Sequence, residues 1–415
     1  MTRLFLNKKL TFSLTACVAA VTSSFAMADF INDSHAAIEM RNMYMNRDFR
    51  NSNSAETMKD WGQGFTLQLK SGFTEGTVGF GLDVMAQQGI KLDSGKGRSG
   101  TGVLLVQKDG TPAEEWSDLG GAAKMRLSKS TLAVGTLQPV LPVVMYNDTR
   151  LLATTFTGGL INSQEIEGLA FNAGRLTETK LRNSSNREDM SYAYNGATSD
   201  HFDFAGGSYQ ISKQLSASYY YGALDNVYQQ HFIGLVHNLP LAEGVSLRSD
   251  LRYFRSDDTG QAHVGKIGNN FFNGMLTLGV QAHKFGVGLQ HINGEGNIPF
   301  LSGTDPYSIN LVTYNTFTKA NTDAWQVRYD YDFAALGVPG LTFMSRYVSG
   351  SDIESGTVTN GREWERDSDL GYVIQNGPLK GVNLRWRNVT FRSSNGLTND
   401  LDENRIILGY TLALW

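Results

Sequence analysis

The sequence predicts an all-β protein: a transmembrane antiparallel β-barrel of about 18 strands with inward-folded constriction loops. Three observations predict it. Many segments alternate between apolar and polar residues with the period of two that is typical of a strand. The chain begins with the pattern of a secretory signal. It ends on an alternating segment with a terminal aromatic residue.

The alternation is clearest between Asp323 and Phe333, where one face carries Trp, Val, Tyr and Phe and the other carries Gln, Arg and Asp. Similar runs occur at Phe65–Lys70, Ala123–Ser128 and Leu215–Tyr221. In a membrane barrel the apolar face contacts lipid and the polar face lines a wet lumen. Because a soluble β-sandwich or β-helix would show the same alternation, the two ends of the chain decide between these classes.

Residues 1–28 have the composition of a secretory signal peptide. Basic residues precede an apolar stretch, and Ala26-Met27-Ala28 is an Ala-x-Ala cleavage site. We therefore expect a mature barrel over residues 29–415. A competing cleavage site precedes Cys17, because residues 14–17 loosely resemble a lipoprotein box.

The segment Ile406–Trp415 resembles the C-terminal signal by which outer-membrane barrels are recognised for insertion. Trp415 departs from the pattern, because it does not share the parity of the apolar residues before it. No run of about 18 apolar residues follows the signal, so the sequence predicts no transmembrane helix. These features predict a location in a bacterial outer membrane.

Composition limits the chemistry that we expect. The one cysteine, Cys17, lies in the signal, so the mature chain forms no disulfide and has no thiolate chemistry. The balance of 36 Lys and Arg against 40 Asp and Glu gives no reason to expect nucleic acid. A Gly-x-Ser-x-Gly elbow, a phosphate-binding glycine loop and a metal-ligand spacing of histidines are all missing. We expect no enzyme activity, catalytic residue, metal site or cofactor.

Turn residues and polar stretches separate the expected strands. Short turns are expected at Asn238–Pro240, Val338–Gly340 and Gly377–Pro378, and extracellular loops at Asp93–Asp118, Asn293–Tyr307 and Ser349–Arg362.

The segment Pro139–Gly159 is too apolar for a solvated loop and too interrupted for a clean strand. We interpret part of it as a loop that folds into the barrel and narrows the pore. An ordinary strand pair with poor alternation is the alternative interpretation.

Parity assigns more basic than acidic residues to the lumen. The assignment to the lumen is clearest for Arg385 and Arg387, because Leu384 and Trp386 flank them on the face that contacts lipid. An arginine that faces lipid at the midplane costs about 2–4 kcal/mol. A guanidinium can hold a carboxylate through two parallel hydrogen bonds. In the alternative interpretation these arginines pair with acidic residues and brace the wall. The inward set is Lys70, Lys124, Arg126, Arg248, Arg252, Arg328, Arg385 and Arg387 against Asp83, Asp250, Asp330 and Asp332.

Short motifs are distributed over the whole mature chain. They are Phe30–His35, Arg41–Phe49, Lys59–Phe65, Lys124–Ser128, Asp148–Leu152, Glu165–Leu169, Arg182–Asn186, Gln326–Phe333, Leu384–Asn388 and Asp402–Arg405. Together they resemble the OprD family of substrate-specific outer-membrane porins. The resemblance implies an 18-stranded pore that is constricted by two inward loops. It also implies a ladder of basic residues opposite an acidic or carbonyl-rich patch.

The resemblance carries this pattern onto particular residues. The basic ladder falls on Arg41, Arg126, Arg385, Arg387 and Arg405. One constricting loop falls on Pro139–Gly159, with Asp148 and Arg150, and the other on Asn297–Pro306, with Asp305 as the acidic residue of the pore.

Members of this family pass either basic amino acids or cyclic and aromatic carboxylates, and overall similarity favours the second group. The resemblance therefore implies passive uptake of small carboxylate-bearing solutes by a monomer or loose trimer in outer-membrane lipid. The alternatives are a basic amino-acid or peptide porin of the same family, and a plugged structural or enzymatic barrel.

Overall fold

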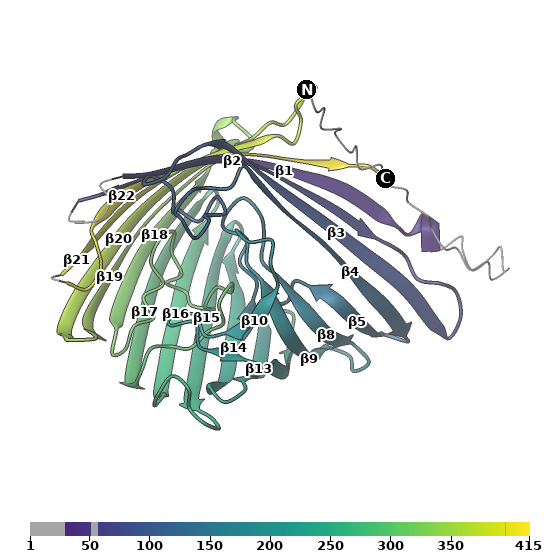
Figure 1. The fold of residues 1–415 in the computed structure, drawn as a ribbon, viewed down its shortest axis with the longest axis horizontal. Coiled ribbons are helices and arrows are strands. Elements are labelled where there is room, and N and C mark those ends of the chain that lie inside the picture. The colour runs from purple at the N-terminus through teal and green to yellow at the C-terminus, as the bar shows by residue number, and fades with distance from the viewer. Residues whose placement is uncertain (1–29, 51–56, 395) are drawn as a thin grey trace, which may run out of the picture.

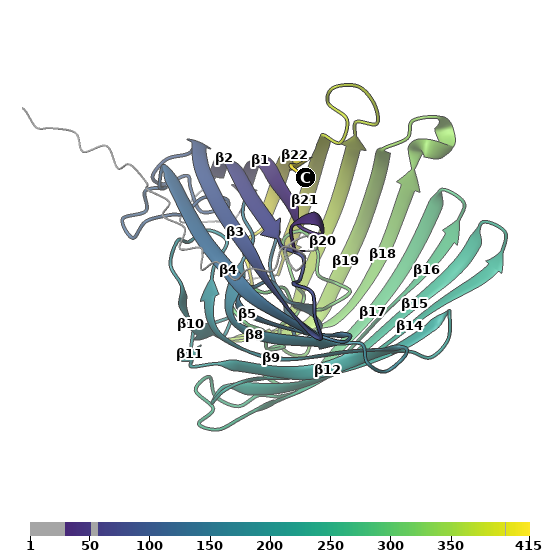
Figure 2. The ribbon, with the colours of Figure 1, turned by 90° about the vertical axis from the view of Figure 1, so that its right-hand side faces the viewer.

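The computed structural model describes residues 30–50, 57–394 and 396–415. Within these ranges, 18 antiparallel strands form the wall of a barrel (Figures 1 and 2). β1 (His35–Phe49) pairs with β22 (Leu401–Ala413) and closes it. The predicted all-β barrel is therefore confirmed. The predicted signal peptide, residues 1–28, lies outside the described residues.

The remaining strands of the wall follow in chain order, each paired with the next. They are β2 (Thr57–Lys70), β3 (Val78–Asp93), β4 (Glu115–Leu127), β5 (Ser130–Leu137), β8 (Thr155–Ser163), β9 (Leu169–Lys180), β12 (Phe202–Gln210), β13 (Leu215–Leu224), β14 (Tyr228–Ala242), β15 (Val245–Asp258), β16 (Gly268–Val280), β17 (His283–Glu295), β18 (Asp323–Asp332), β19 (Leu341–Ser355), β20 (Val358–Val373) and β21 (Asn383–Ser393). The connections contain β6 (Val140–Leu141), β7 (Val144–Met145), β10 (Glu188–Ser191), β11 (Thr198–Ser199) and the 3₁₀ helix η1 (Phe333–Leu336). None of the described residues forms a helix that is long and apolar enough to cross a bilayer.

The two ends of the barrel differ in the length of their connections. The end at which β1 begins and β22 ends has short turns, and the opposite end has the long connections. Short turns are typical of the periplasmic end and long loops of the extracellular end. Three extracellular loops matter below, and we name them L3 (residues 138–154), L4 (residues 181–201) and L7 (residues 296–322).

Two of the predicted connections are wrong. Asn238–Pro240 belongs to β14, and a register irregularity between Pro240 and Ala242 accommodates a proline that cannot donate to the ladder. Most of Ser349–Arg362 is strand, because β19 and β20 continue beyond the membrane as a polar hairpin. The predicted turns at Val338–Gly340 and Gly377–Pro378 do lie between strands at the periplasmic end.

The outer face is apolar, as the alternation predicts. Val327, Leu289 and Leu251 are among the large apolar side chains that it exposes. Trp325 lies against Tyr347, and Tyr347 against the ring of Trp364, with centroids 5.5 Å apart in both pairs. Aromatic rings near strand ends form the girdles with which membrane barrels meet the interface.

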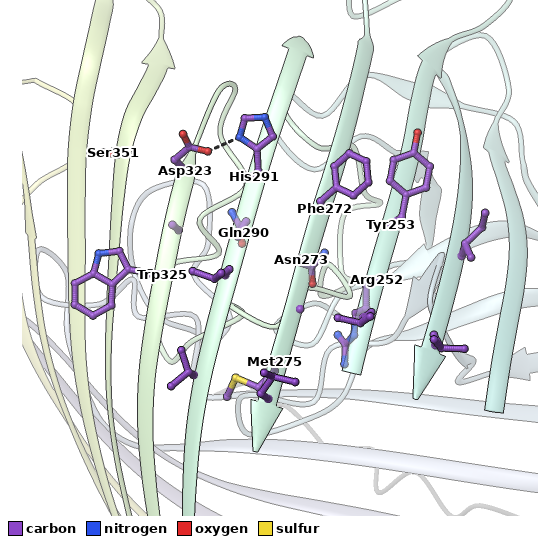
Figure 3. Close-up of a pocket in the computed structure, with 18 residues that line it drawn as sticks. Arg252, Tyr253, Phe272, Asn273, Met275, Gln290, His291, Asp323, Trp325 and Ser351 are labelled. Atoms are coloured by element: carbon purple, nitrogen blue, oxygen red, sulfur yellow. Dashed lines mark hydrogen bonds and ion pairs between the residues drawn. The ribbon is translucent and has the colours of Figure 1, made fainter. Parts of the chain in front are cut away.

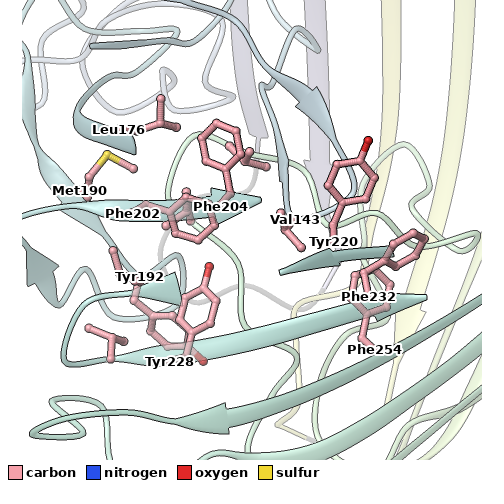
Figure 4. Close-up of a cluster of buried hydrophobic side chains, with 14 of the residues drawn as sticks. Val143, Leu176, Met190, Tyr192, Phe202, Phe204, Tyr220, Tyr228, Phe232 and Phe254 are labelled. Atoms are coloured by element: carbon pink, nitrogen blue, oxygen red, sulfur yellow. The ribbon is translucent and has the colours of Figure 1, made fainter. Parts of the chain in front are cut away.

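Part of the inner face is apolar, which the alternation did not predict. Inward-facing aromatic side chains of β12–β16 pack against Val143 and Val144 of L3 and Leu301 of L7 (Figure 4). These loops cover the wall and exclude water, so the inward positions behind them behave as a core. Each buried aromatic side chain stabilises the covered state by about 1.5–3 kcal/mol. The aromatic residues are Phe202, Phe204, Tyr220, Phe232, Phe254 and Phe271.

The side of L3 that faces away from β12–β16 packs against β2. Gly62 and Gly64 face inward, and Leu151 of L3 fills the space that larger residues would need. A Cβ atom at Gly64 would lie 2.7 Å from the carbonyl oxygen of Leu151. The Nε2 atom of Gln87 also donates to the carbonyl of Ala153 at 3.2 Å. L3 therefore crosses the lumen with both of its sides packed.

A column of acidic side chains runs along the inner face of β20. It consists of Glu363, Glu365, Asp367 and Asp369, which are only 1–4% exposed. Buried carboxylates are costly unless they are paired and hydrogen-bonded, so the column must attract partners from other elements.

Three members of this column hold L7. Glu365 accepts hydrogen bonds from the backbone N–H groups of Tyr314 and Asn315, both at 2.8 Å. Asp367 accepts from the backbone N–H of Thr313 at 3.2 Å, and Glu363 pairs with a lysine of the same loop. A hydrogen bond to a charged group contributes about 1.5–3 kcal/mol, so the column fixes the tip of L7 inside the pore.

Replacing Glu365 with alanine should loosen L7 without unfolding the barrel, because it removes the acceptor of two loop N–H groups and leaves the sheet intact. We expect single-channel recordings to show a larger and more variable conductance. Glu114→Ala, which removes an exposed carboxylate from the connection between β3 and β4, is the control. An unchanged conductance in Glu365→Ala would mean that the column does not position L7.

Candidate functional site

Two arginines of β21 share one carboxylate. The Nε atom of Arg385 donates to Asp369 Oδ1 at 2.7 Å, and that of Arg387 donates to Asp369 Oδ2 at 2.5 Å. Within the described residues neither guanidinium pairs with a second acidic group. The side chain of Arg385 is 48% exposed and that of Arg387 is 25% exposed. The three groups together present a net positive charge to the lumen.

Around Arg41 of β1 the acidic groups outnumber the basic ones, because two carboxylates share one guanidinium. Its guanidinium donates to both carboxylate oxygens of Asp148 at 2.7 and 3.1 Å, and to Glu39 at 2.5 Å. It also donates to the carbonyl oxygen of Arg150 at 2.6 Å. These partners occupy the two terminal nitrogens of the Arg41 guanidinium, and those on L3 hold that loop against the wall of the barrel. Both carboxylates keep 39% of their side-chain surface exposed.

These groups line a recess of about 300 Å³ between β1, β21, β22 and L3. Arg385 and Arg387 lie on its basic side, and Glu39 and Asp148 on its acidic side. A hollow of this volume is at the lower end of the range for small-molecule sites. The other lining residues include Met43, Thr149, Asn383, Ile407, Tyr410 and Thr411.

Asp305 lies where L7 meets L3. Its carboxylate accepts a hydrogen bond from the Nδ2 atom of Asn147 at 2.6 Å, and its backbone N–H donates to the carbonyl of Met145 at 3.0 Å. Burial raises the pKa of Asp305, and the nearby Arg182 of L4 opposes that rise. Asp305 thus joins the two constricting loops and is not among the residues that line the recess.

Arg150 and Arg182 support the constriction from behind. Arg150 is buried and donates to the carbonyl oxygens of Thr101 at 3.1 Å and Thr149 at 2.9 Å. Burial lowers the pKa of Arg150 well below its usual value, and Arg405 and Arg182 add to this effect by repulsion. Burial also lowers the pKa of Arg182 to about 10.

The other two residues of the expected ladder lie away from the recess. Arg405 is 1% exposed and donates to Glu403 at 2.5 Å and to the carbonyl of Thr313 at 2.7 Å, so it holds L7. Arg126 is exposed at the periplasmic end of β4, with its guanidinium 4.6 Å from the ring centroid of Phe73. The structure therefore brings Arg41, Arg385 and Arg387 together and leaves Arg126 and Arg405 apart.

Sequence reasoning missed Asp369, which both arginines share, and Glu39, which lines the acidic side. A signal for Asp369 was present, because Glu363, Glu365, Asp367 and Asp369 occupy alternate positions of one segment. On one strand such residues must share a face.

A further hollow lies on the outer surface of the barrel (Figure 3). Its volume is about 860 Å³, and apolar side chains of β14–β18 line it below the His291–Asp323 pair. Since this face contacts lipid, the hollow lies off the path through the lumen. No cluster of three metal-ligating side chains occurs among the described residues.

A closed barrel, narrowed by inward loops and lined by charged side chains, is the architecture of an outer-membrane diffusion porin. The chain belongs to the OprD family, described as outer membrane porin, whose model matches residues 28–414. The resemblance that the motifs carried is therefore confirmed. The protein is a substrate-specific porin of the bacterial outer membrane and not an enzyme.

Three known proteins show how similar the chain is to others. The porin-like protein GalP of Pseudomonas putida is 38% identical over 404 residues, which are 96% of this chain and 97% of GalP. The crystal structure of OccK9 (OpdG) of Pseudomonas aeruginosa has a TM-score of 0.91 at 40% identity and covers 93% of this chain and 100% of its own. OpdK of Pseudomonas aeruginosa, crystallised with vanillate, has a TM-score of 0.89 at 37% identity with the same coverage.

Replacing Asp148 with alanine should raise the anion selectivity of the pore, because Arg41 would keep Glu39 as its one acidic partner. We expect the chloride-to-potassium permeability ratio, measured from the reversal potential in a KCl gradient, to rise about two- to fivefold, as a solvated ion pair of ~0.5–1 kcal/mol implies. Asp250→Ala removes another inward acid, which pairs with Arg252, and is the control. Equal shifts in both variants would mean that the position of Asp148 has no special effect.

Proposed function

We propose that this porin passively takes up small carboxylate-bearing solutes, with aromatic or cyclic carboxylates favoured. The observation that carries the proposal is the sharing of Asp369 by Arg385 and Arg387. Asp369 compensates only one of the two guanidinium charges, and Arg385, which lines the recess, keeps 48% of its side chain exposed. A solute carboxylate supplies that anion through charge-assisted hydrogen bonds.

The expected strength of this contact suits transport. Each charge-assisted hydrogen bond contributes about 1.5–3 kcal/mol, so two of them amount to roughly the 4 kcal/mol of a millimolar dissociation constant. A channel site must be favourable enough to fill and weak enough to empty. A site of this strength meets both conditions without any energy input.

Two further observations support a ring as the rest of the solute. Ile407, which is partly exposed on the inner parity of β22, supplies apolar surface inside the recess. Vanillate, the molecule crystallised with the similar porin OpdK, is an aromatic carboxylate. The size of the recess favours one ring over larger solutes.

One observation favours the second candidate, a porin for basic amino acids. Glu39 and Asp148 are partly exposed and share the single guanidinium of Arg41. A solute with a carboxylate at one end and a cation at the other could span the recess from the arginines to these acids. Block by arginine stronger than block by benzoate would favour this candidate.

Replacing both Arg385 and Arg387 with alanine should reduce benzoate block of the single-channel current by about tenfold, because loss of one charge-assisted bond of ~1.5 kcal/mol already gives that factor. Arg366→Ala is the control. Arg366 lies on the outer parity of β20, where it donates to Asn388 and Thr390, and its loss should leave block unchanged. Undiminished benzoate block in the double variant would defeat the proposal.

We also propose that the mature chain begins at Asp29 and that it acts as a monomer or loose trimer. N-terminal sequencing of protein from outer membranes should return Asp29, and its mass in mild detergent should correspond to one or three chains. A lipid-modified N-terminus at Cys17 would contradict the first statement, and a stable dimer the second.

A further inference from the structure

A second hollow in the lumen lies between L3 and the inner face of β2–β5. Its volume is about 320 Å³, close to that of the arginine recess. Polar and apolar side chains line it in similar measure. They include Gln68, Lys70, Asp83, Met85, Ala122, Thr136, Gln138, Val140 and Tyr146. We call this hollow the L3 chamber.

The strand register places the L3 chamber nearer the periplasm than the arginine recess. Arg41 pairs in register with Gly64 of β2, and β2 runs from there toward the periplasmic end at Lys70. The six residue steps from Gly64 to Lys70 span about 20 Å at the rise of a strand. A solute that leaves the recess inward therefore meets the L3 chamber next.

The two hollows meet at the contact between Arg41 and Asp148. A small hollow of about 30 Å³ is lined by Glu39, Arg41 and Asp148 from the recess and by Gln68 and Tyr146 from the chamber. A space of this size holds water molecules and no solute. The recess and the chamber are thus separate sites on either side of one ion pair.

The L3 chamber also has a surplus of positive charge. Lys70 is exposed, and no ion pair or hydrogen bond involves its side chain within the described residues. Its register partner Asp83 is engaged by Lys124, with Nζ 2.6 Å from Oδ1. Arg126 is not among the residues that line the chamber, but it stands beside Lys124 over the same phenylalanine ring and has no acidic partner in the described structure. Basic groups therefore outnumber the carboxylate around Asp83, as they do around Asp369.

The L3 chamber offers an apolar contact close to this charge. Val140 is 66% exposed, although it lies inside the barrel on β6. Tyr146 is partly buried and lines the same hollow, with Met85 on the wall. An exposed valine in a lumen leaves apolar surface in water, and a solute ring that covers it gains about 25 cal/mol for each Å² removed from water.

We propose that the L3 chamber is a second binding site on the same path, for monocyclic aromatic or alicyclic carboxylates. Lys70 holds the carboxylate, and Val140 with Tyr146 contacts the ring. The proposal rests on the proposed function, because it assigns the same class of solute to a later point of the path. A solute then moves from Arg385 and Arg387 to Lys70 when the ion pair between Arg41 and Asp148 opens, because the space beside the closed pair admits only water.

Single-channel block by benzoate tests the proposal, with the porin inserted in one orientation. Lys70→Gln should shorten benzoate block from the periplasmic side about threefold, the size expected for one solvated charge contact. Lys284→Gln is the matched control, because Lys284 is an exposed lysine on the inner parity of β17 near the same end of the barrel. It should leave the block unchanged. Equal effects of both variants, or none of Lys70→Gln, would overturn the proposal.

A second variant separates the ring contact from the charge. Val140→Ser should weaken block by benzoate and leave block by acetate unchanged, because acetate has no ring to cover the side chain. Equal changes for the two anions would overturn the ring contact. These outcomes are distinct from failure of the proposed function. If Lys70→Gln has no effect while the Arg385 and Arg387 double variant loses benzoate block, the L3 chamber is refuted and the proposed function stands.

Discussion

The inward parity of four carboxylates on β20 determines both the shape of the pore and its charge. Alternation points Glu363, Glu365, Asp367 and Asp369 away from lipid, and burial then forces each of them to find donors. The first three take theirs mainly from L7, so they draw that loop into the lumen. Asp369 takes two arginines of the neighbouring strand. The same strand therefore narrows the pore and leaves a positive surplus beside the narrow part.

Loops and walls divide the lumen into two unlike halves. Over β12–β16 the inward side chains are aromatic, and L3 and L7 cover them as they would cover a core. On the opposite side, β18–β22 and β1 keep charged side chains in contact with water. The arginine recess lies on the charged side, because apolar burial holds the loops on the other. Binding there stays weak, since water screens the exposed groups and each guanidinium keeps part of its hydration.

Much of the wall could be predicted from the sequence, because a period of two fixes the face of every residue once the strand is known. Arg385, Arg387 and Arg126 face the lumen for this reason. The contacts of the loops could not be predicted. Asp305 meets Asn147 across 158 positions of sequence, and no local pattern reports such a pair. The parity rule failed at Phe202 and Phe254 because it assumes a wet lumen, whereas loops dry this part of it. Arg405 follows the rule, yet L7 covers it.

In the function that we propose, the two arginines around Asp369 hold the carboxylate of the solute in the recess beside L3. A crystal structure with 4-bromobenzoate tests it most directly, because the anomalous signal of bromine locates the ring. We expect a bromine peak inside the recess, with the carboxylate within hydrogen-bond distance of Arg385 or Arg387. A ligand ordered elsewhere in the lumen, with no contact to either arginine and an empty recess, would contradict it.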